Sequence, residues 1–328
     1  MIPSTDSRPH RRPVAFLIAL LAGLCCTPVL SQPSWPTAPI RFIVPYPAGG
    51  NADAVARLVA NKLAAGLGQP VVVDNKAGAG GTIGTQLAAK SPSDGSTFLM
   101  TPSGVLTITP NLRKVPYDAL GDLVPVARVS GSYGLVAARK DLPANSIPEL
   151  IALARKDPGK LTFGSAGTAT ATHITGEIVH AKTGIKVMHV PYKGSVEALN
   201  DLVAGRIDLV YDPVAFAQAK AGKAKVLAVT SPQRHPELPD VPTMRELKID
   251  VPAGSWFGVL APRGTPSAVI THLAAEIEKV VNMPDTREQM LRFSQYPDYK
   301  APDSFASAIR EEFVFFKDLF AQTGMKLD

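Results

Sequence analysis

Glycines and hydroxyl side chains gather at three places where a short apolar run gives way to a helical pattern. The three turns are residues 46–51, residues 77–84 and residues 164–173. Glycines let backbone N–H groups face a cleft, and the start of a helix adds the positive end of its dipole. Such turns predict a site that holds an anion. A tight turn followed by an ordinary capped helix explains any one of them equally well.

The first turn, residues 46–51, ends in a residue that can cap the following helix. That residue is Asn51, whose side-chain oxygen suits an N-cap. Asp53 falls in the first helical turn, where a carboxylate interacts favourably with the helix dipole. We therefore favour a dipole partner over a ligand contact for Asp53 on this pattern alone.

The second turn, residues 77–84, resembles a dinucleotide fingerprint in its glycine spacing. That fingerprint needs an acidic residue at the end of the next strand to hold the ribose. Residues 101–103 (Thr-Pro-Ser) stand there instead, so we expect no nucleotide cofactor. The same glycines still offer free amides at a helix start, and Thr82 adds a hydroxyl.

The third turn contains Ser165 and, eight residues later, His173, which raises a secreted serine hydrolase as an alternative function. A nucleophile elbow needs glycine two residues before and two residues after the serine. Gly167 satisfies the second requirement, but Phe163 occupies the first position. No carboxylate is placed by the sequence to orient His173. We therefore expect this turn to provide hydroxyl and amide donors and expect no enzymatic activity.

Two aspartates, Asp208 and Asp212, accompany a predicted strand over residues 207–211. A spacing of four places both side chains on one face of a strand. Paired carboxylates can perform acid/base chemistry, but no activated nucleophile accompanies them. Asp212, at the strand end, is placed to accept a ligand ammonium or to brace a loop. The histidines lack the spacing of a metal site, so we expect no metal.

The first thirty-one residues have the three parts of a secretory signal peptide. Residues 8–12 form a basic head, residues 14–22 are apolar, and Ser31 offers a small residue for cleavage. We expect export and cleavage after Ser31, with a retained N-terminal anchor as the alternative. Both cysteines, Cys25 and Cys26, lie in this segment, so the mature chain would form no disulfide.

The charge of the chain is mildly basic. It has 34 basic and 28 acidic residues, a net charge of +6, and the predicted signal peptide accounts for three arginines and one aspartate, leaving +4. No cluster of Lys and Arg with interleaved aromatic residues is present, so we expect no nucleic-acid partner. The 30 prolines and 26 glycines are spread through the chain, which favours many short turns over a disordered tract.

Beyond Pro39, short runs of β-branched residues alternate with amphipathic helical patterns, which predicts an α/β fold with parallel strands. The predicted strands cover residues 40–45, 71–73, 97–100, 161–163, 186–190, 207–211 and 226–229. Helices are predicted over residues 52–67 and, near the C-terminus, over 266–282, 285–293 and 303–322.

Two extended segments, residues 124–138 and 255–262, break this alternation. We interpret them as two crossings between lobes. Lobe one would consist of residues 32–133 and 257–328, and lobe two of residues 134–256. Ligands of open α/β sheets bind outside the carboxyl ends of the strands. The glycine-rich turns of both lobes would then face a shared gap.

A short internal echo supports two similar halves. Residues 44–50 (Val-Pro-Tyr-Pro-Ala-Gly-Gly) end a predicted strand and open a helix, and residues 190–195 (Val-Pro-Tyr-Lys-Gly-Ser) do the same. Valine-proline-tyrosine is short enough to recur by chance, so the echo is suggestive only.

These motifs resemble the tripartite tricarboxylate transporter receptor family, the Bug-type periplasmic receptors. The matching segments are residues 44–50 with Asp53, 68–84, 158–167 with His173, 190–194 with Asp208 and Asp212, 238–243, 256–262 and 264–266. The resemblance runs from about Trp35 to the C-terminal helices. It implies a two-lobed periplasmic binding protein of type II, the Venus-flytrap fold, with a hinge. It also implies a ligand carboxylate held between the lobes by backbone amides and water.

Carried over by position, the resemblance implies which residues face the ligand. They are Tyr46, Ala48, Gly49, Asp53, Gly80 and Thr82 on lobe one, and Ser165, Thr168, His173, Tyr192 and Asp212 on lobe two. Residues 167–172 carry alanine and threonine where relatives often have Gly-Ser, so ligand preference is expected to differ. We expect a monomeric periplasmic receptor that captures a small organic carboxylate for a membrane permease or a sensor protein.

Overall fold

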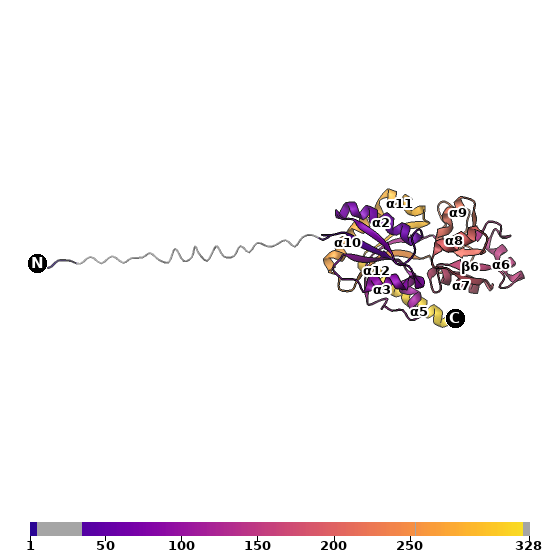
Figure 1. Ribbon diagram of the computed structural model, residues 1–328, viewed down its shortest axis with the longest axis horizontal. Coiled ribbons are helices and arrows are strands. Elements are labelled where there is room, and N and C mark those ends of the chain that lie inside the picture. Colours follow the sequence, from indigo (N-terminus) through magenta and orange to yellow (C-terminus); the bar gives the residue numbers. More distant parts are fainter. Residues whose placement is uncertain (5–34, 253, 324–328) are drawn as a thin grey trace. The chain divides into compact units, whose positions relative to one another are not determined.

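The computed structural model describes residues 1–4, 35–252 and 254–323. The predicted signal peptide, its cleavage after Ser31 and both cysteines lie outside the described residues. Contacts divide the chain into Met1–Trp35 and Pro36–Asp328, and the fold below is that of the second unit (Figure 1). Among its described residues, none of the helices combines the length and hydropathy needed to span a bilayer.

The first lobe is built on a six-stranded mixed sheet of strand order β11-β4-β10-β3-β1-β2. Its strands are β1 (Ile40–Val44), β2 (Val71–Asn75), β3 (Thr97–Pro102), β4 (Leu123–Ser132), β10 (Trp256–Pro262) and β11 (Gln295–Lys300). Its helices are α2 (Asn51–Leu67), α3 (Thr82–Ala89), α4 (Gly104–Thr107), α5 (Thr109–Leu112), α10 (Ser267–Asn282), α11 (Pro284–Leu291) and α12 (Pro302–Thr323), with the short 3₁₀ turn η1 (Ala79–Gly81). Helices α2, α10 and α11 cover one face of the sheet, and α3 and α12 cover the other (Figure 1).

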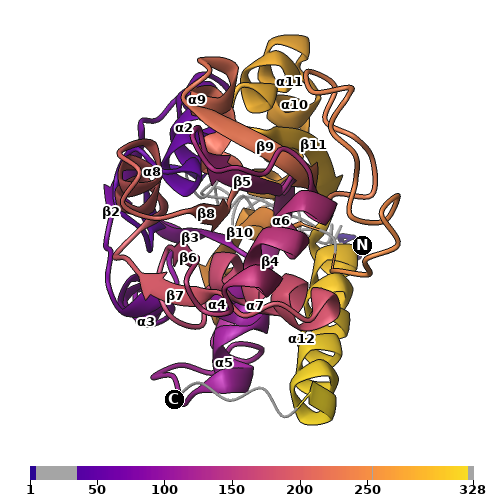
Figure 2. The same ribbon diagram turned by 90° about the vertical axis from the view of Figure 1, so that its right-hand side faces the viewer.

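The second lobe is built on a five-stranded mixed sheet of strand order β7-β6-β8-β5-β9. Its strands are β5 (Leu135–Arg139), β6 (Thr162–Ser165), β7 (Met188–Pro191), β8 (Leu209–Tyr211) and β9 (Ala224–Val229). Its helices are α6 (Ile147–Lys156), α7 (Ala171–Thr183), α8 (Ser195–Val203) and α9 (Phe216–Lys220), with the turn η2 (Pro213–Ala215). Figure 2 views this lobe from its outer end, with α6 to α9 in front of the first lobe.

The prediction of purely parallel strands is wrong at the strands next to the crossings. Strand β1 is parallel to β2 and β3, and β6 is parallel to β7 and β8. In contrast, β10 is antiparallel to both β3 and β4, and β5 is antiparallel to β8 and β9. The physical reason is topological, because the chain leaves the first lobe along β4 and returns along its neighbour β10.

The two crossings are short in sequence. Only Tyr133 and Gly134 separate β4 from β5, and the chain re-enters the first sheet at Trp256. The predicted segment over residues 124–138 is therefore two strands in different sheets rather than one. The lobe boundaries proposed from the sequence, at 133/134 and 256/257, stay predictions.

A predicted helix cap is wrong, and one strand was missed. Asn51 does not cap α2, whose N-cap is Gly50 without a side-chain hydrogen bond; the Asn51 amide instead donates to the Phe293 carbonyl at 3.2 Å. Strand β11 was not predicted, because Gln295–Lys300 is largely polar and contains Pro297. It is an edge strand antiparallel to β4, a position that tolerates proline.

Candidate ligand cavity between the two lobes

Three helices begin at one cavity, which we call the central cavity. It is lined by Tyr46, Pro47, Gly50, Asn51, Ala52, Pro102, Ser132, Ala166, Thr170, Ala171, Thr172, Gly194, Ser195, Val196, Glu197, Asp212, Pro213, Ser255 and Phe257. The walls enclose about 690 Å³, the open mouth included. The lining residues come from both lobes, so the cavity lies between them.

The starts of α2 and α8 leave backbone donors open toward this cavity. Their N-cap residues, Gly50 and Gly194, are extended and make no side-chain cap hydrogen bond. The first N–H groups of a helix have no partner within the helix. The third helix, α7, is capped by Thr170, whose hydroxyl accepts from the His173 N–H. The cavity therefore combines three positive helix ends with unpaired backbone donors.

The charged side chains of the central cavity are acidic. Among the described lining residues there is no Lys, Arg or His, and the two charged ones are Asp212 and the exposed Glu197. Asp212 is 5 % exposed and accepts hydrogen bonds from the Ser195 hydroxyl and from the Val214 N–H. Burial raises the pKa of Asp212 above its usual range, although these two hydrogen bonds oppose the shift. Asp212 thus joins η2 to the start of α8.

Tyr46 forms one wall of the central cavity and is held in place at both ends. Its hydroxyl donates to the Gly80 carbonyl at 3.1 Å, and its own carbonyl accepts from the Asn75 amide at 3.0 Å. Burial of the hydroxyl raises the pKa of Tyr46, so the ring stays neutral. The first and second glycine-rich turns are therefore tied together.

Three further residues predicted on the first turn, Ala48, Gly49 and Asp53, do not line the central cavity. Ala48 and Gly49 are exposed. Asp53 is buried, accepts from the Gly49 N–H at 3.0 Å and pairs with Arg57 at 2.9 Å. Burial acts to raise the pKa of Asp53, but the hydrogen bonds from Arg57 and Gly49 hold it below its usual value. An ionised Asp53 therefore braces the turn from behind.

A second cavity, the side cavity, contains three other predicted residues, Gly80, Thr168 and Tyr192. It is lined by Pro47, Ala77, Gly78, Ala79, Gly80, Arg113, Gly167, Thr168, Pro191, Tyr192, Lys193 and Glu197. Pro47 and Glu197 belong to both cavities. Unlike the central cavity, the side cavity contains basic side chains, Arg113 and Lys193. The predicted residue Thr82 lines neither cavity; its buried hydroxyl donates to the Ala79 carbonyl at 3.0 Å.

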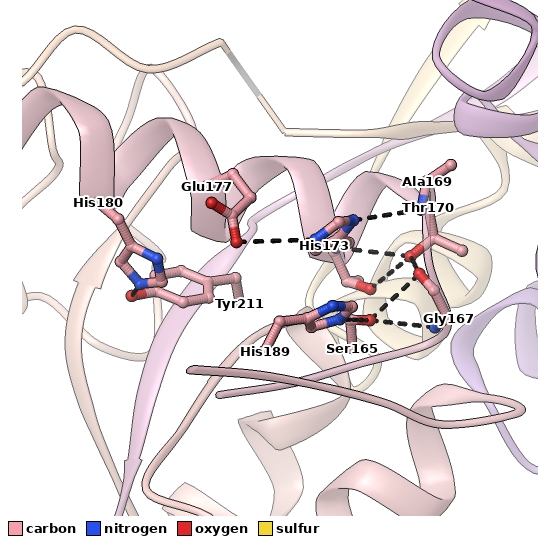
Figure 3. Close-up of polar contacts among 10 residues, drawn as sticks. Ser165, Gly167, Ala169, Thr170, His173, Glu177, His180, His189 and Tyr211 are labelled. Carbon is pink, nitrogen blue, oxygen red and sulfur yellow. Dashed lines mark hydrogen bonds and ion pairs between the residues drawn. The ribbon is translucent and has the colours of Figure 1, made fainter. Parts of the chain in front are cut away.

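Ser165 and His173 lie inside the second lobe and do not bond to each other (Figure 3). The Ser165 hydroxyl is 2.7 Å from Nε2 of His189, a histidine that the sequence did not single out. Nδ1 of His173 accepts from the Ala169 N–H at 3.2 Å, and the His173 ring stacks on His189 with centroids 3.8 Å apart. Ser165 is only 1 % exposed. These contacts hold the third turn in place from the interior of the second lobe.

The prediction that one strand carries both Asp208 and Asp212 is wrong. Strand β8 is limited to Leu209–Tyr211, so both aspartates fall outside it. Asp208 pairs with Arg139 at 2.8 Å and accepts from the Thr162 N–H at 2.9 Å. Within the described ranges, no group of three His, Cys, Asp or Glu side chains could hold a metal ion.

Sequence reasoning missed much of the cavity lining. Ser132 and Ser255 lie at the two crossings, and Phe257 lies in β10 beside them. Ser195 and Val196 open α8, directly after the echo of the first turn. The repeated Val-Pro-Tyr motif was the available signal, because each copy is followed by a glycine that directly precedes a helix. These glycines are Gly50, before α2, and Gly194, before α8.

Two contacts join the lobes beside the central cavity. The Thr109 hydroxyl donates to the Ala169 carbonyl at 3.0 Å, and both groups are buried. Gly194 lies so close to the other lobe that a Cβ on it would be 2.9 Å from Cδ and Cγ of Pro47. The walls of the cavity are therefore in direct contact in this structure.

Comparison with known proteins identifies the family. The model of the tripartite tricarboxylate transporter family receptor matches residues 55–324. The chain belongs to this family. Among its members, a UPF0065 protein in the tcbD-tcbE intergenic region of Pseudomonas sp. strain P51 is 38 % identical over 307 residues, which are 92 % of this chain and 91 % of that protein. Protein BugT of Bordetella pertussis is 34 % identical over 95 % of this chain and 98 % of its own length.

Solved structures similar to this chain support the same family assignment. The periplasmic binding protein BugD superposes with a TM-score of 0.84 at 34 % identity, covering 89 % of this chain and 99 % of its own. The Rhodopseudomonas palustris protein Rpa4515, solved with adipate, has a TM-score of 0.85 at 32 % identity and covers 89 % of this chain and 99 % of its own. MatC from the same organism, with bound malate, has a TM-score of 0.81 at 29 % identity, over 87 % of this chain and 99 % of its own.

The comparisons confirm three predictions for this receptor. They are the family, the two-lobed periplasmic binding fold and the role of a periplasmic solute-binding receptor. The family consists of solute receptors, so the protein is not an enzyme. The serine hydrolase alternative has no support, because the family is not hydrolytic and Ser165 is bonded to His189 rather than to His173.

Proposed function

We propose that this periplasmic receptor binds a small organic carboxylate in the central cavity and closes its two lobes around it. It then delivers the ligand to a membrane permease or to a sensor protein. The observation that carries this proposal is the meeting of three helix starts, from both lobes, at a cavity whose described lining residues include no basic side chain.

The physical argument is that uncharged donors hold an anion reversibly. A helix start stabilises a nearby negative charge by about 0.3–1 kcal/mol, rising to about 2 kcal/mol when partly buried. A hydrogen bond to a charged group contributes a further ~1.5–3 kcal/mol. Several such interactions support binding, while the lining residues offer no activated nucleophile. The cavity therefore suits capture and release.

Closure follows from the distribution of the donors. Helix α2 belongs to the first lobe, and α7 and α8 belong to the second. A ligand can contact both groups only when the lobes are together, so binding shifts the population toward the closed form. The contact of Thr109 with Ala169 adds to that form. We propose that the crossings at Tyr133–Gly134 and before Trp256 act as the hinge.

The remaining predictions from the sequence form part of this proposal. We propose export by a signal peptide that is cleaved after Ser31, lobes of residues 32–133 with 257–328 and of residues 134–256, and a monomeric receptor. Of the predicted ligand-facing residues, Tyr46 and Asp212 line the central cavity. We propose that Ala48, Gly49, Asp53, Thr82, Ser165 and His173 act indirectly by holding the three turns in place, and that Gly80, Thr168 and Tyr192 border the route to the cavity.

The ligand class is supported by relatives. Rpa4515 was solved with adipate and MatC with malate, and both fold like this chain. A thermal-shift screen of the mature receptor tests the class, because saturating ligand at about 100 times Kd stabilises a protein by ~2.7 kcal/mol. We expect at least one mono-, di- or tricarboxylate to raise Tm. A panel in which neutral sugars or cations raise Tm and no carboxylate does would contradict the proposal.

A further inference from the structure

The hydrogen atoms of the central cavity's hydroxyl groups are largely engaged within the protein. A hydroxyl has one hydrogen to donate. The Tyr46 hydroxyl donates to the Gly80 carbonyl, the Ser132 hydroxyl to the Gln295 side-chain oxygen, and the Thr170 hydroxyl to the Gly167 carbonyl. The Ser195 hydroxyl donates to Asp212.

The other polar side chains of the cavity are also partnered. The Thr172 hydroxyl accepts from the Ala166 N–H and lies 3.1 Å from the Thr170 hydroxyl. The Ser255 hydroxyl lies 3.0 Å from that of Ser103. Apart from one N–H of the Asn51 amide, which donates its other hydrogen to Phe293, the donors left for a ligand are therefore concentrated in the backbone at the three helix starts.

The positive charge of the cavity is too small to hold two anionic groups. Each helix start is equivalent to roughly half a positive elementary charge. Three of them are partly offset by the buried Asp212, and Glu197 at the mouth adds further negative charge. A second carboxylate on the ligand would find no cation among the described lining residues. Desolvating an unpaired carboxylate is costly.

The remaining walls are apolar. Phe257, Val196 and three prolines line the space between the lobes; the prolines are Pro47, Pro102 and Pro213. Phe257 is 5 % exposed. Apolar walls stabilise an apolar body by about 25 cal/mol for each Å² removed from water. Apolar walls do not stabilise a second carboxylate.

We propose that the ligand of this receptor is a monocarboxylate with an apolar body, rather than a di- or tricarboxylate. This inference rests on the proposed function, namely that the central cavity binds a carboxylate. It distinguishes this chain from relatives such as those solved with adipate and malate. The one carboxylate lies at the helix starts of α2, α7 and α8, and the apolar body lies against Phe257 and the prolines.

The inference is tested with ligand pairs that differ only in their second carboxylate. Calorimetric titrations at pH 7.5 of the full, processed protein, purified without denaturation, compare hexanoate with adipate and benzoate with terephthalate. We expect the monocarboxylate of at least one pair to bind at least tenfold more tightly than its dicarboxylate partner. A dicarboxylate that binds as tightly as its partner, or more tightly, would overturn the inference while the proposed function stands.

A charge added to the wall tests the same inference by changing the protein instead of the ligand. Val196 lines the cavity and is half-buried, so Val196→Lys places a cation within reach of a second carboxylate. We expect this variant to shift the ratio of affinities toward the dicarboxylate by about tenfold. The matched control is Val203→Lys at the other end of α8, where the valine is 39 % exposed, and it leaves the ratio unchanged.

The outcomes separate the two proposals. A shift in Val196→Lys and none in Val203→Lys supports a cavity limited to one negative charge. An unchanged ratio in a folded Val196→Lys protein counts against it. If Val196→Lys does not fold, the ratio measured for the unaltered protein decides the inference. Absence of binding by every carboxylate, with binding of sugars or cations, would instead reject the proposed function.

Discussion

The central and side cavities share the wall formed by Pro47 and Glu197, yet they differ in the groups that could bind an anion. The central cavity presents backbone N–H groups at fixed positions and, in the part of the chain that the structure describes, no basic side chain. The side cavity presents Arg113 and the exposed Lys193. A lysine is a mobile charge that attracts any anion, whereas helix starts impose a position and a direction. In the proposed function, selection therefore takes place in the central cavity, and the basic residues lie at its border.

The largest effect is expected from placing a fixed negative charge at the start of α8. In Val196→Glu, the new carboxylate would occupy the positive end of the helix and repel the ligand. We expect affinity for a ligand identified in the screen to fall more than a hundredfold by calorimetry. Val203→Glu, at the far end of the helix, is the control and should bind normally. Similar losses in both variants would mean that the α8 start does not hold the anion.

The two glycine N-caps provide a matched pair that separates closure from capping. Both Gly50 and Gly194 are extended, so alanine causes no backbone strain at either. A Cβ at Gly194 would meet the Pro47 ring of the other lobe at 2.9 Å, whereas a Cβ at Gly50 would meet only the Pro47 carbonyl at 3.8 Å. We expect Gly194→Ala to weaken binding by roughly tenfold and Gly50→Ala by less than threefold. Equal effects would argue against a closed contact at Pro47.

Loss of the hydrogen bond between the lobes should weaken ligand binding less than Gly194→Ala does. Thr109→Val keeps the volume of the side chain and removes the donor to the Ala169 carbonyl. A lost hydrogen bond of about 1 kcal/mol corresponds to roughly fivefold weaker binding. Thr286→Val is the control, because Thr286 is also fully buried and its hydroxyl has no partner. Normal affinity in Thr109→Val would show that this contact does not favour the closed form.

Acid should affect the second lobe, whose third turn is held by a hydrogen bond between Ser165 and His189. Burial, with the nearby His173 and His180, lowers the pKa of His189 to about 4, and Glu177 acts in the opposite direction. The unfolded chain would take up a proton near the ordinary pKa of about 6.5. The stability that neutral His189 provides is therefore present above pH 6.5 and is lost as pH falls from there toward 4.

Chemical denaturation at pH 7 and pH 5 measures this loss. We expect a lower free energy of unfolding at pH 5, and a smaller difference between the two pH values in His189→Gln, which cannot titrate. The same pH dependence in both proteins would assign the acid sensitivity to other groups.

The smallest effect is expected at the side cavity. Lys193→Met removes an exposed cation but leaves the helix starts intact. Equilibrium affinity should stay within twofold, and any change should be in the association rate and its salt dependence. A tenfold loss of affinity at equilibrium would place the carboxylate in the side cavity.

Much of the fold was predictable because β-branched runs and amphipathic spacing mark single elements. Strands β1, β3 and β9 and helix α2 lie within a few residues of their predictions. Strand direction was not predictable in this way, because β4 and β10 are antiparallel through the path of the chain between lobes. Polar edge strand β11 carried no such pattern.

The site was predictable in kind rather than in detail. Glycine-rich turns at helix starts indicated an anion site, and α2, α7 and α8 do begin at one cavity. Which residues face that cavity depends on packing between elements that are distant in sequence. Ser165 and His173 sit in the third turn and its helix, but their side chains point into the lobe toward His189 and Ala169. Phe257 lines the cavity from β10, the strand of the first lobe along which the chain returns from the second lobe.

A structure with bound ligand tests the central claim most directly. We predict carboxylate oxygens about 3 Å from backbone nitrogens at the starts of α2 and α8, with the rest of the ligand against Phe257 and no cationic side chain in contact. A carboxylate bound to Arg113 and Lys193 in the side cavity, with the helix starts left without a ligand, would contradict the account.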